Sequence, residues 1–566
     1  MAGHSRCTQS DMGPEVRSSL PAARLAGLVA SVEGTTITLT APYAAQPETP
    51  YLGEPNPRGT VGEFLLVKSR GFTLLARLTR VELSQRDMHR ADWHPGSQPP
   101  DTPIGEAQLL ATVQPDGALR PGVEAMPRIG DSVFSANSDL LKAGIGSIGG
   151  GVSLGHLSQN NKVPVELNME ALLGRHLAVL GSTGGGKSWT VAHLAEEVRR
   201  AGGRLLLLDA SGEYATLGTD AEHLVASRTG ASLPLHEMSD SDRILFFRPS
   251  SGSQLPKMAT AIASLRLAAV LGESHQLVTN GHIVKKGIPR ANYQRVERDH
   301  ADVVNDPHAV FDVRKLAVQI GHECIYPNDR NHPENFGDVN HQEIAYCSTL
   351  MTRISETCRV PVVMDFIAVT GGPTLLGEAS DWLKSGRPGI LRIDLSELPQ
   401  TNYLREITVN TIGARLLEMA RAGDLRANPL VVALDEAHQF LGRTLGEEQA
   451  SVRPESFELI AKEGRKFGLS LIVATQRPGD IPGGVLSQMG CLVVHRLTER
   501  RDQDHVADAS SHFDRSLAHL LPALVPGECL IVGSALPLAI PVKLTPPQHM
   551  PNSDGPRFGA WSPVTP

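Results

Sequence analysis

The chain has 566 residues, of which 41% are hydrophobic and 20% charged, and its formal net charge is −8. At roughly 150 residues per domain, this length suggests about three or four domains with true hydrophobic cores. An acidic chain is not built as a whole to coat nucleic acid, although a local basic surface, such as a pore lining, is compatible with it.

Cysteine spacing and hydropathy exclude several other classes. The six cysteines contain no CxxC pair, which argues against a zinc ribbon and against a disulfide framework. The N-terminal stretch lacks the apolar core of a signal peptide, and no run approaches the roughly 18 apolar residues of a membrane helix. We therefore expect a cytoplasmic protein with no membrane association.

The first part of the chain has the sequence pattern of a small β domain. Residues 1–20 are polar and are expected to be disordered. Apolar and threonine positions then alternate between turn signals in three segments: 27–41, 61–83 and 106–122. Closely spaced short strands of this kind predict a small barrel or sandwich over 21–150. The glycine-rich stretch 144–155 is expected to be the linker that leaves it.

From about residue 160 strands alternate with helices, which predicts a parallel sheet with crossover helices. Strands are expected within 176–181, 204–214, 243–251, 390–397, 429–442, 469–478, 491–497 and 528–544. Helices are expected within 188–202, 404–423 and 457–467. We predict a core formed by 160–251 and 386–545, of α/β class.

The segment 252–385 breaks this alternation and is expected to be a mainly helical insertion. It contains four possible metal ligands, His322, Cys324, His332 and His341. Their spacing matches no zinc pattern, so a histidine-rich loop is the favoured interpretation over a metal site. The proline-rich end, 546–566, is expected to form a tail or strap.

The stretch GSTGGGKS matches the pattern GxxxxGK[ST] between a predicted strand and a predicted helix. Glycines let backbone N–H groups turn toward phosphate oxygens, and the helix adds its positive end. Lys187 is expected to reach the β- and γ-phosphates of ATP and Ser188 to bind Mg²⁺. A merely flexible glycine turn is the alternative, disfavoured by this context. The nucleotide-binding set is Gly181, Ser182, Thr183, Gly184, Gly185, Gly186, Lys187, Ser188 and Trp189.

Two later strand ends complete a hydrolytic site. Five apolar residues precede Asp435 and Glu436, and we expect Asp435 to hold Mg²⁺ and Glu436 to polarise the attacking water. Gln476 ends the next strand and is placed to sense the γ-phosphate. The alternatives are an acidic helix start and a polar strand cap. Asp209 and Glu213 either approach the metal or lie in a solvated turn.

Two arginines are candidates for charge stabilisation of the transferred phosphate. Arg465 and Lys466 precede the Gln476 strand, and Arg175 precedes the phosphate-loop strand. Each is expected either to clamp nucleotide, in cis or across a subunit boundary, or to be an exposed basic residue. Spacing alone does not decide between these roles.

With these motifs in order, the chain resembles the HerA family of hexameric DNA translocases, relatives of FtsK among the additional-strand RecA-like ATPases. The likeness is carried by the phosphate loop, "LDASGEY", "IDLSEL", "VVALDEAHQFL", "EGRKFGLSLIVATQRPGDIPGG" and "LPALVPGECLIVG". It implies an N-terminal β-barrel, a RecA-like core and the nucleotide roles given above. It also implies that Arg465 acts on nucleotide and that Arg175 acts across the subunit boundary.

The resemblance further implies a homo-hexamer with double-stranded DNA in its pore. It implies a partner effector on the N-terminal barrel: a NurA-like nuclease, another nuclease or a sirtuin-like NADase, in DNA processing or anti-phage defence. The long insertion departs from a minimal family member, and the acidic charge argues against strong autonomous DNA binding.

Three other functions compete with this one. The first is a ring scaffold that activates its partner with ATP as a switch, and the second is a type IV secretion ATPase that docks at membranes. The third, a DEAH-box RNA helicase, is suggested by "DEAH", but such helicases have two RecA-like lobes, and this chain carries one phosphate loop.

Overall fold

The computed structural model describes residues 22–44, 50–51, 58–83, 103–146, 151–227, 229–368, 371–442, 454–510, 513, 515–534, 536 and 538–553. The expected disorder of residues 1–20 lies outside these ranges. The chain forms two compact units, and each is described by itself: Met1–Leu172 with Gly490–Thr545, and Leu173–Met489 with Pro546–Pro566.

A closed six-stranded barrel forms the first part of unit 1. Its strands pair in the order β2-β1-β7-β3-β4-β5, and β5 pairs with β2 to close it. The bounds are β1 Leu25–Glu33, β2 Thr36–Thr40, β3 Phe64–Ser69, β4 Phe72–Glu82, β5 Ile104–Val113 and β7 Ser132–Ser135, with β6, Leu119–Pro121, paired to β5. Buried and half-buried residues alternate along β2 and β5, and the buried apolar side chains fill the barrel. The three predicted strand segments are confirmed.

Glycine permits the closest approach in the barrel. A Cβ on Gly27 would lie 1.6 Å from the carbonyl oxygen of Thr40, so no larger residue fits where β1 passes β2. The register of β1 against β7 shifts at this point, between Leu25 and Gly27, as expected of a bulge that bends a barrel strand.

Unit 1 also contains an antiparallel sheet in the order β18-β19-β20-β8-β9. Its strands are β8 Val152–Leu157, β9 Asn160–Leu167, β18 Cys491–Val494, β19 Glu528–Gly533 and β20 Ile540–Leu544; the helices of this unit are α1 Ser138–Gly146, α15 Arg500–Ala509 and α16 Arg515–Ala518. The linker predicted for 144–155 is therefore wrong in its larger part. Its start ends α1 and its end forms most of β8, because Val152, Leu154 and Leu157 are buried.

A six-stranded parallel sheet forms the centre of unit 2, in the order β12-β15-β11-β16-β17-β10. The bounds are β10 Leu177–Leu180, β11 Arg204–Asp209, β12 Ala221–Val225, β15 Gly389–Asp394, β16 Leu430–Leu434 and β17 Leu469–Thr475. The central strands are near-continuous buried apolar runs, as parallel sheets covered on both faces require.

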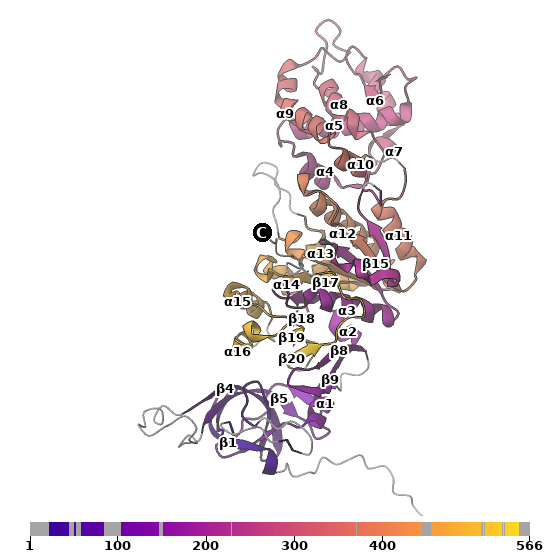
Figure 1. Ribbon diagram of the computed structural model, residues 1–566. Helices are drawn as coiled ribbons and strands as arrows, with labels where there is room; N and C mark the ends of the chain where they lie inside the picture. The colour runs from indigo at the N-terminus through magenta and orange to yellow at the C-terminus, as the bar shows by residue number, and fades with distance from the viewer. Residues whose placement is uncertain are drawn as a thin grey trace, which may run out of the picture. The chain divides into compact units, whose positions relative to one another are not determined.

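Helices of unit 2 connect these strands and pack on the sheet (Figure 1). They are α3 Lys187–Arg200, α4 Asp240–Phe247, α11 Leu375–Ser385, α12 Leu404–Ala422, α13 Ser456–Glu463 and α14 Gly483–Leu486. Helix α2, Met169–Leu173, belongs to unit 1 except for its last residue and joins the two units in sequence. The predicted α/β class is confirmed: a RecA-like core, an N-terminal barrel and a helical insertion.

The insertion is a group of helices around its own small core, seen in Figure 1 around α5, α6, α8 and α9. Its elements are α5 Gln254–Leu271, α6 Arg290–Asp299, α7 Ala301–Val304, α8 Leu316–Glu323, α9 His341–Thr357 and α10 Pro361–Ile367, with a two-stranded β13–β14 ribbon, Val278–Thr279 and His282–Ile283. The predicted helical character is confirmed.

The strand predicted for 243–251 is wrong, because its first half lies in helix α4. Ser239 caps this helix: its hydroxyl accepts from the Asp242 amide, and the Asp242 carboxylate accepts from the Ser239 amide. This reciprocal capping box favours a helix start. Arg248 ends the helix in the left-handed region, with φ of 53°. Among the described helices, none combines the length and apolar character of a membrane-spanning segment.

Candidate functional site

The predicted site residues lie together at the carboxyl ends of the parallel strands. In the strand order β17 lies between β10, which leads into the phosphate loop, and β16, which leads into Asp435 and Glu436. Gln476 directly follows β17. The strand inserted between these two motifs therefore carries the predicted sensor residue to the same edge as both.

The phosphate loop has the backbone that such a loop requires. Gly184 and Gly186 have φ of 73° and 115°, in the left-handed region that favours glycine. Gly186 caps α3, and Lys187 and Ser188 open the helix. The Thr190 amide and hydroxyl donate to the carbonyl oxygen of Gly186, at 3.0 and 3.1 Å. The loop therefore ends on a helix N-terminus whose positive end suits phosphate.

Ser188 contacts an acidic residue from the loop after β11. Its Oγ donates to Glu213 Oε2 at 2.7 Å. Gly212, with φ of 82°, turns the chain just before Glu213. Glu213 therefore belongs to the site, and the solvated-turn alternative does not hold for it.

Asp435 and Glu436 form the centre of a carboxylate cluster. Asp435 is 4% exposed. Burial, with Glu436, Asp209 and Glu213 nearby, raises the pKa of Asp435 to about 8, against the opposing effect of Lys187. Burial likewise raises the pKa of Glu436, while Lys187 opposes this effect. Such crowding favours either protons or a cation between the carboxylates.

Glu436 has an uncommon backbone for a non-glycine residue, with φ of 47°. Its Oε2 lies 3.3 Å from His438 Nδ1, which in turn lies 3.2 Å from the Thr475 hydroxyl. Strain of this kind persists where surrounding structure enforces it, often at functional sites. The turn after β16 therefore holds the Glu436 side chain in a fixed direction.

Asp209 has a structural role in shaping the neighbouring loop. It is completely buried, and its carboxylate accepts from the Gly212 and Tyr214 amides at 2.8 and 3.1 Å. Arg392 on β15 donates to Asp209 at 2.7 Å and to Asp394 at 2.8 Å. This buried network fixes the loop that presents Glu213.

The two predicted arginines lie at the amino ends of the parallel strands, whereas the phosphate loop lies at their carboxyl ends. Arg175 precedes β10, Arg465 precedes β17, and both side chains are exposed. Directly after Arg175 comes His176, which is 3% exposed and whose Nδ1 accepts from the Leu471 amide at 3.0 Å. Burial, with Arg465 nearby, lowers the pKa of His176 to about 4. A neutral imidazole thus anchors the turn that follows Arg175 to strand β17.

Sequence reasoning missed two contacts of the site. The missed contacts are the Ser188–Glu213 hydrogen bond and the proximity of His438 to Glu436. Their one signal in the sequence was a polar residue shortly after a strand, Glu213 after β11 and His438 after β16. In the described residues, no three His, Cys, Asp or Glu side chains are grouped as a metal site. His322 and Cys324 are therefore not part of such a group, and Cys324 is buried. Trp189, the third residue of α3, is half-buried.

A parallel sheet with a phosphate loop on one strand, paired acids on another and a sensor strand between them defines a P-loop ATPase of the additional-strand type. Residues 152–312 match the central domain of the helicase HerA, and residues 407–531 match the HerA-like helicase C-terminal domain. The chain belongs to the HerA family.

Curated relatives are named as helicases, several of them as HerA. The DNA double-strand break repair helicase HerA of Pyrococcus furiosus is 26% identical over 464 residues, 78% of each chain. A probable helicase of Methanocaldococcus jannaschii is 25% identical over 451 residues, 78% of this chain and 76% of the relative.

Among solved structures, similarity extends to VirB4 of Thermoanaerobacter pseudethanolicus, at 15% identity and a TM-score of 0.45, covering 70% of this chain and 96% of that one. The plasmid coupling protein TrwB in complex with ADP and Mg²⁺ is also 15% identical, with a TM-score of 0.44, covering 72% and 91%. The family assignment rests on the sequence matches.

Proposed function

We propose that the protein is an ATP-hydrolysing DNA translocase or helicase that works as a homo-hexamer. The observation that carries the proposal is the convergence of Lys187, Ser188, Glu436 and Gln476 on one edge of the sheet. The proposal uses the division of the chain expected from the sequence: barrel 21–150, ATPase core 160–251 with 386–545, insertion 252–385 and tail 546–566. Residues 160–172 and 490–545 of this proposed core fall in unit 1.

The residues at this edge fit Mg²⁺–ATP. The buried carboxyl of Asp435, with its pKa raised to about 8 by burial and by neighbouring acids, is a group that a divalent cation would stabilise in its charged form. Ser188 Oγ and Asp435 are the residues that would hold Mg²⁺, since a hydroxyl and a carboxylate are oxygen ligands of the kind this cation prefers. Mg²⁺ held there supplies charge neutralisation at the β- and γ-phosphates.

The chain's own groups divide the remaining work. Backbone amides of Gly184, Gly185 and Gly186 and the ammonium of Lys187 bind the phosphates. Glu436 orients and polarises the attacking water, and its raised pKa suits a group that accepts a proton. Gln476 holds the phosphate loop through Thr183 and senses the γ-phosphate.

The positions of the two arginines support completion of the site by a neighbouring subunit. Arg465 and the phosphate loop are separated by the length of β17, about 20 Å at the usual rise per residue. Arg465 and Arg175 therefore serve a neighbour's nucleotide, and a heterologous closed ring provides that arrangement where an isologous dimer does not. Double-stranded DNA is the proposed occupant of the pore.

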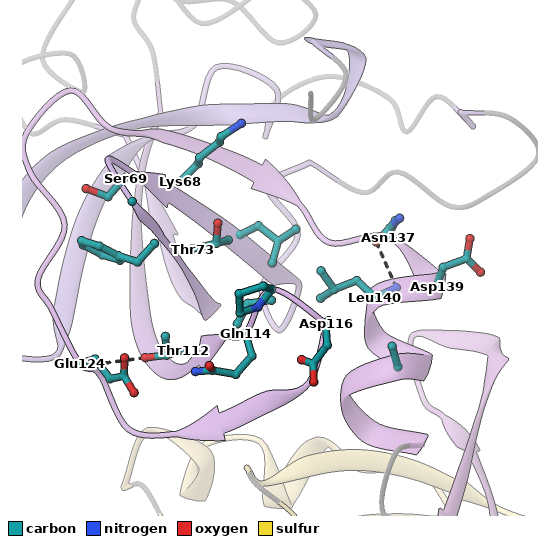
Figure 2. Close-up of a pocket in the computed structure, with 17 residues that line it drawn as sticks. Lys68, Ser69, Thr73, Thr112, Gln114, Asp116, Glu124, Asn137, Asp139 and Leu140 are labelled. Atoms are coloured by element: carbon teal, nitrogen blue, oxygen red, sulfur yellow. Dashed lines mark hydrogen bonds between the residues drawn. The ribbon is translucent and has the colours of Figure 1, made fainter. Parts of the chain in front are cut away.

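The barrel of unit 1 is the proposed docking face for a partner effector, a NurA-like or other nuclease or a sirtuin-like protein. A cavity of about 630 Å³ opens there between the β3–β4 hairpin, the β5–β6 hairpin and α1. Figure 2 shows Thr73, Gln114, Asp116 and Leu140 around it. A recess with mixed apolar and polar walls is what a partner side chain uses as an anchor.

The test is the mass of the purified chain, with and without a co-expressed partner, together with ATP hydrolysis with and without duplex DNA. A hexamer whose ATP turnover rises with duplex DNA supports the proposal. No stimulation by DNA, with or without the partner, counts against it. If Glu436→Ala abolishes turnover while partner activation persists in full, the ring is a scaffold instead of a motor.

A further inference from the structure

The C-terminal segment Pro546–Ser553 lies along two elements of the nucleotide site in unit 2. At one end, the amides of Gln548 and His549 both donate to the carboxylate of Glu196, each at 2.9 Å. At the other end, the amide of Asn552 donates to the carbonyl oxygen of Glu213 at 2.8 Å. We call this segment the strap.

The first anchor of the strap is built into helix α3. Glu196 is 5% exposed, and a buried carboxylate needs hydrogen-bond donors to remain charged. The strap supplies two amides, and His549 Nδ1 lies 3.1 Å from the same carboxylate. The helix that begins at Lys187 and Ser188 is therefore held by the strap on its buried side.

The second anchor is the turn that carries Glu213. Glu213 begins the 3-10 segment Glu213–Asp220, and Asp220 at its end forms an ion pair with Arg199 of α3. His549 Nδ1 lies 3.8 Å from Asp220. The strap, α3 and this turn thus contact one another pairwise, which fixes the turn relative to the start of α3.

The contacts among the strap, α3 and the turn control the geometry of the Ser188–Glu213 hydrogen bond. A hydroxyl that donates its proton to a carboxylate directs its lone pairs elsewhere, as a serine ligand of Mg²⁺ must. Groups that orient a metal ligand in this way change metal affinity without touching the metal.

We infer that Glu213 is a positioning residue for Ser188 and that the strap sets its position. This rests on the proposed Mg²⁺–nucleotide site and adds a control of that site by the C-terminal segment. The strap raises the affinity of the site for nucleotide with Mg²⁺ and leaves metal-free nucleotide binding unchanged.

The test uses the full chain and calorimetric titration with ADP, in excess Mg²⁺ and in EDTA. Asn552→Pro removes the amide that holds Glu213, and Asn552→Ala, at an exposed side chain, keeps it. Glu213→Ala removes the acceptor for Ser188, and Glu213→Gln keeps an acceptor oxygen. ATP turnover is measured in parallel for its KM for Mg²⁺ and its kcat.

We expect Glu213→Ala to weaken ADP binding in Mg²⁺ by about 10-fold, with Glu213→Gln partly restoring it. Asn552→Pro weakens the same binding less, Asn552→Ala does not, and no variant changes binding in EDTA. In the Glu213→Ala background Asn552→Pro has no further effect, because both act through one contact.

Equal effects of Asn552→Pro and Asn552→Ala, additive effects with Glu213→Ala, or equal losses in Mg²⁺ and EDTA would overturn the inference. If Asn552→Pro does not fold, Glu196→Gln, which weakens the other anchor, must show the same Mg²⁺-selective loss. A parent chain that binds no ADP in Mg²⁺ overturns the proposed function as well, whereas normal parent binding with unaffected variants overturns the strap alone.

Discussion

The hydroxyl of Thr183 in the phosphate loop donates a hydrogen bond of 2.5 Å to the side-chain oxygen of Gln476 at the tip of β17. These residues are 293 positions apart in the chain. The contact ties the loop that grips phosphate to the strand between the two motifs. If a change at the γ-phosphate displaces either residue, we expect this hydrogen bond to displace the other as well.

Gln476→Ala is expected to lower kcat for ATP hydrolysis by about 10–100-fold, the range for loss of one oriented polar group in the transition state. ADP affinity is expected to stay within a factor of about 3, since Lys187 and the loop amides remain. Single-turnover hydrolysis and calorimetric ADP titration measure the two quantities. Thr183→Val is the matched control, because it removes the contact and leaves Gln476 free to act. An equal loss of ADP affinity and of kcat would show that Gln476 only holds the loop.

The sequence predicted those parts of the site that depend on local pattern. The phosphate loop, the acids after β16 and Gln476 each follow a buried apolar strand, and the carboxyl ends of parallel strands share an edge. The Ser188–Glu213 contact depends on how two loops fold, with Arg392 and Asp209 fixing one of them. No spacing rule encodes that pairing.

The wrong strand at 243–251 has a local physical cause. Ile244, Leu245, Phe246 and Phe247 form an apolar run that suits either a buried strand or a short helix. The deciding signal, the capping pair of Ser239 and Asp242, lies upstream of that run. A short apolar run is therefore interpreted correctly only together with its preceding cap.

The backbone conformation of Glu436 is expected to lower the free energy of unfolding, while its carboxylate is expected to serve ATP hydrolysis. Its φ of 47° costs an L-residue roughly 1–2 kcal/mol. Glu436→Gly is expected to be about 1 kcal/mol more stable to urea than Glu436→Ala, because both lose the carboxylate and only glycine relieves the backbone. Both should lose about 10²–10⁴-fold in kcat. Equal unfolding free energies of the two variants would show that the turn is not strained.

His176 should make stability fall in mild acid. Its pKa is lowered to about 4 in the folded chain, from 6.5. The neutral form is favoured by folding, so this stabilisation is fully present above pH 6.5 and is lost as pH falls toward 4. The loss is of the order of 3 kcal/mol. His176 has a left-handed backbone, with φ of 63°. An asparagine in its place tolerates this conformation and does not titrate, so urea unfolding of His176→Asn from pH 7 to pH 4 should show a flatter slope. An unchanged slope would assign the acid sensitivity to other groups.

Mixing of two inactive variants tests the role of Arg465 across a subunit boundary. Lys187→Ala lacks the phosphate grip, and Arg465→Ala lacks the arginine. Each alone is expected to lose more than about 10³-fold in ATP turnover. In mixed rings an Arg465→Ala site beside a Lys187→Ala neighbour is complete, so partial turnover returns. Arg175→Ala mixed with Lys187→Ala gives the parallel test for Arg175. Mixed rings as inactive as their parents would place the arginine's action in its own subunit.

Two adjacent lysines in the insertion offer a matched test of what holds it together. Lys285 is 5% exposed and pairs with Glu323 at 2.6 Å, and Gln319 donates to the same carboxylate. Lys286 pairs with Asp338 at 2.8 Å on the surface. Lys285→Met leaves a buried carboxylate without its cation, which is expected to cost about 3–5 kcal/mol of unfolding free energy.

Lys286→Met should have no measurable effect, since an exposed pair is screened by water and salt. Urea unfolding followed by circular dichroism gives both values. Lys285→Met combined with Glu323→Leu removes both charges and should recover most of the loss, because apolar residues of similar size fill the site without desolvation. If the double variant is as unstable as Lys285→Met, packing around the aliphatic stem of Lys285, and not its charge, stabilises the insertion.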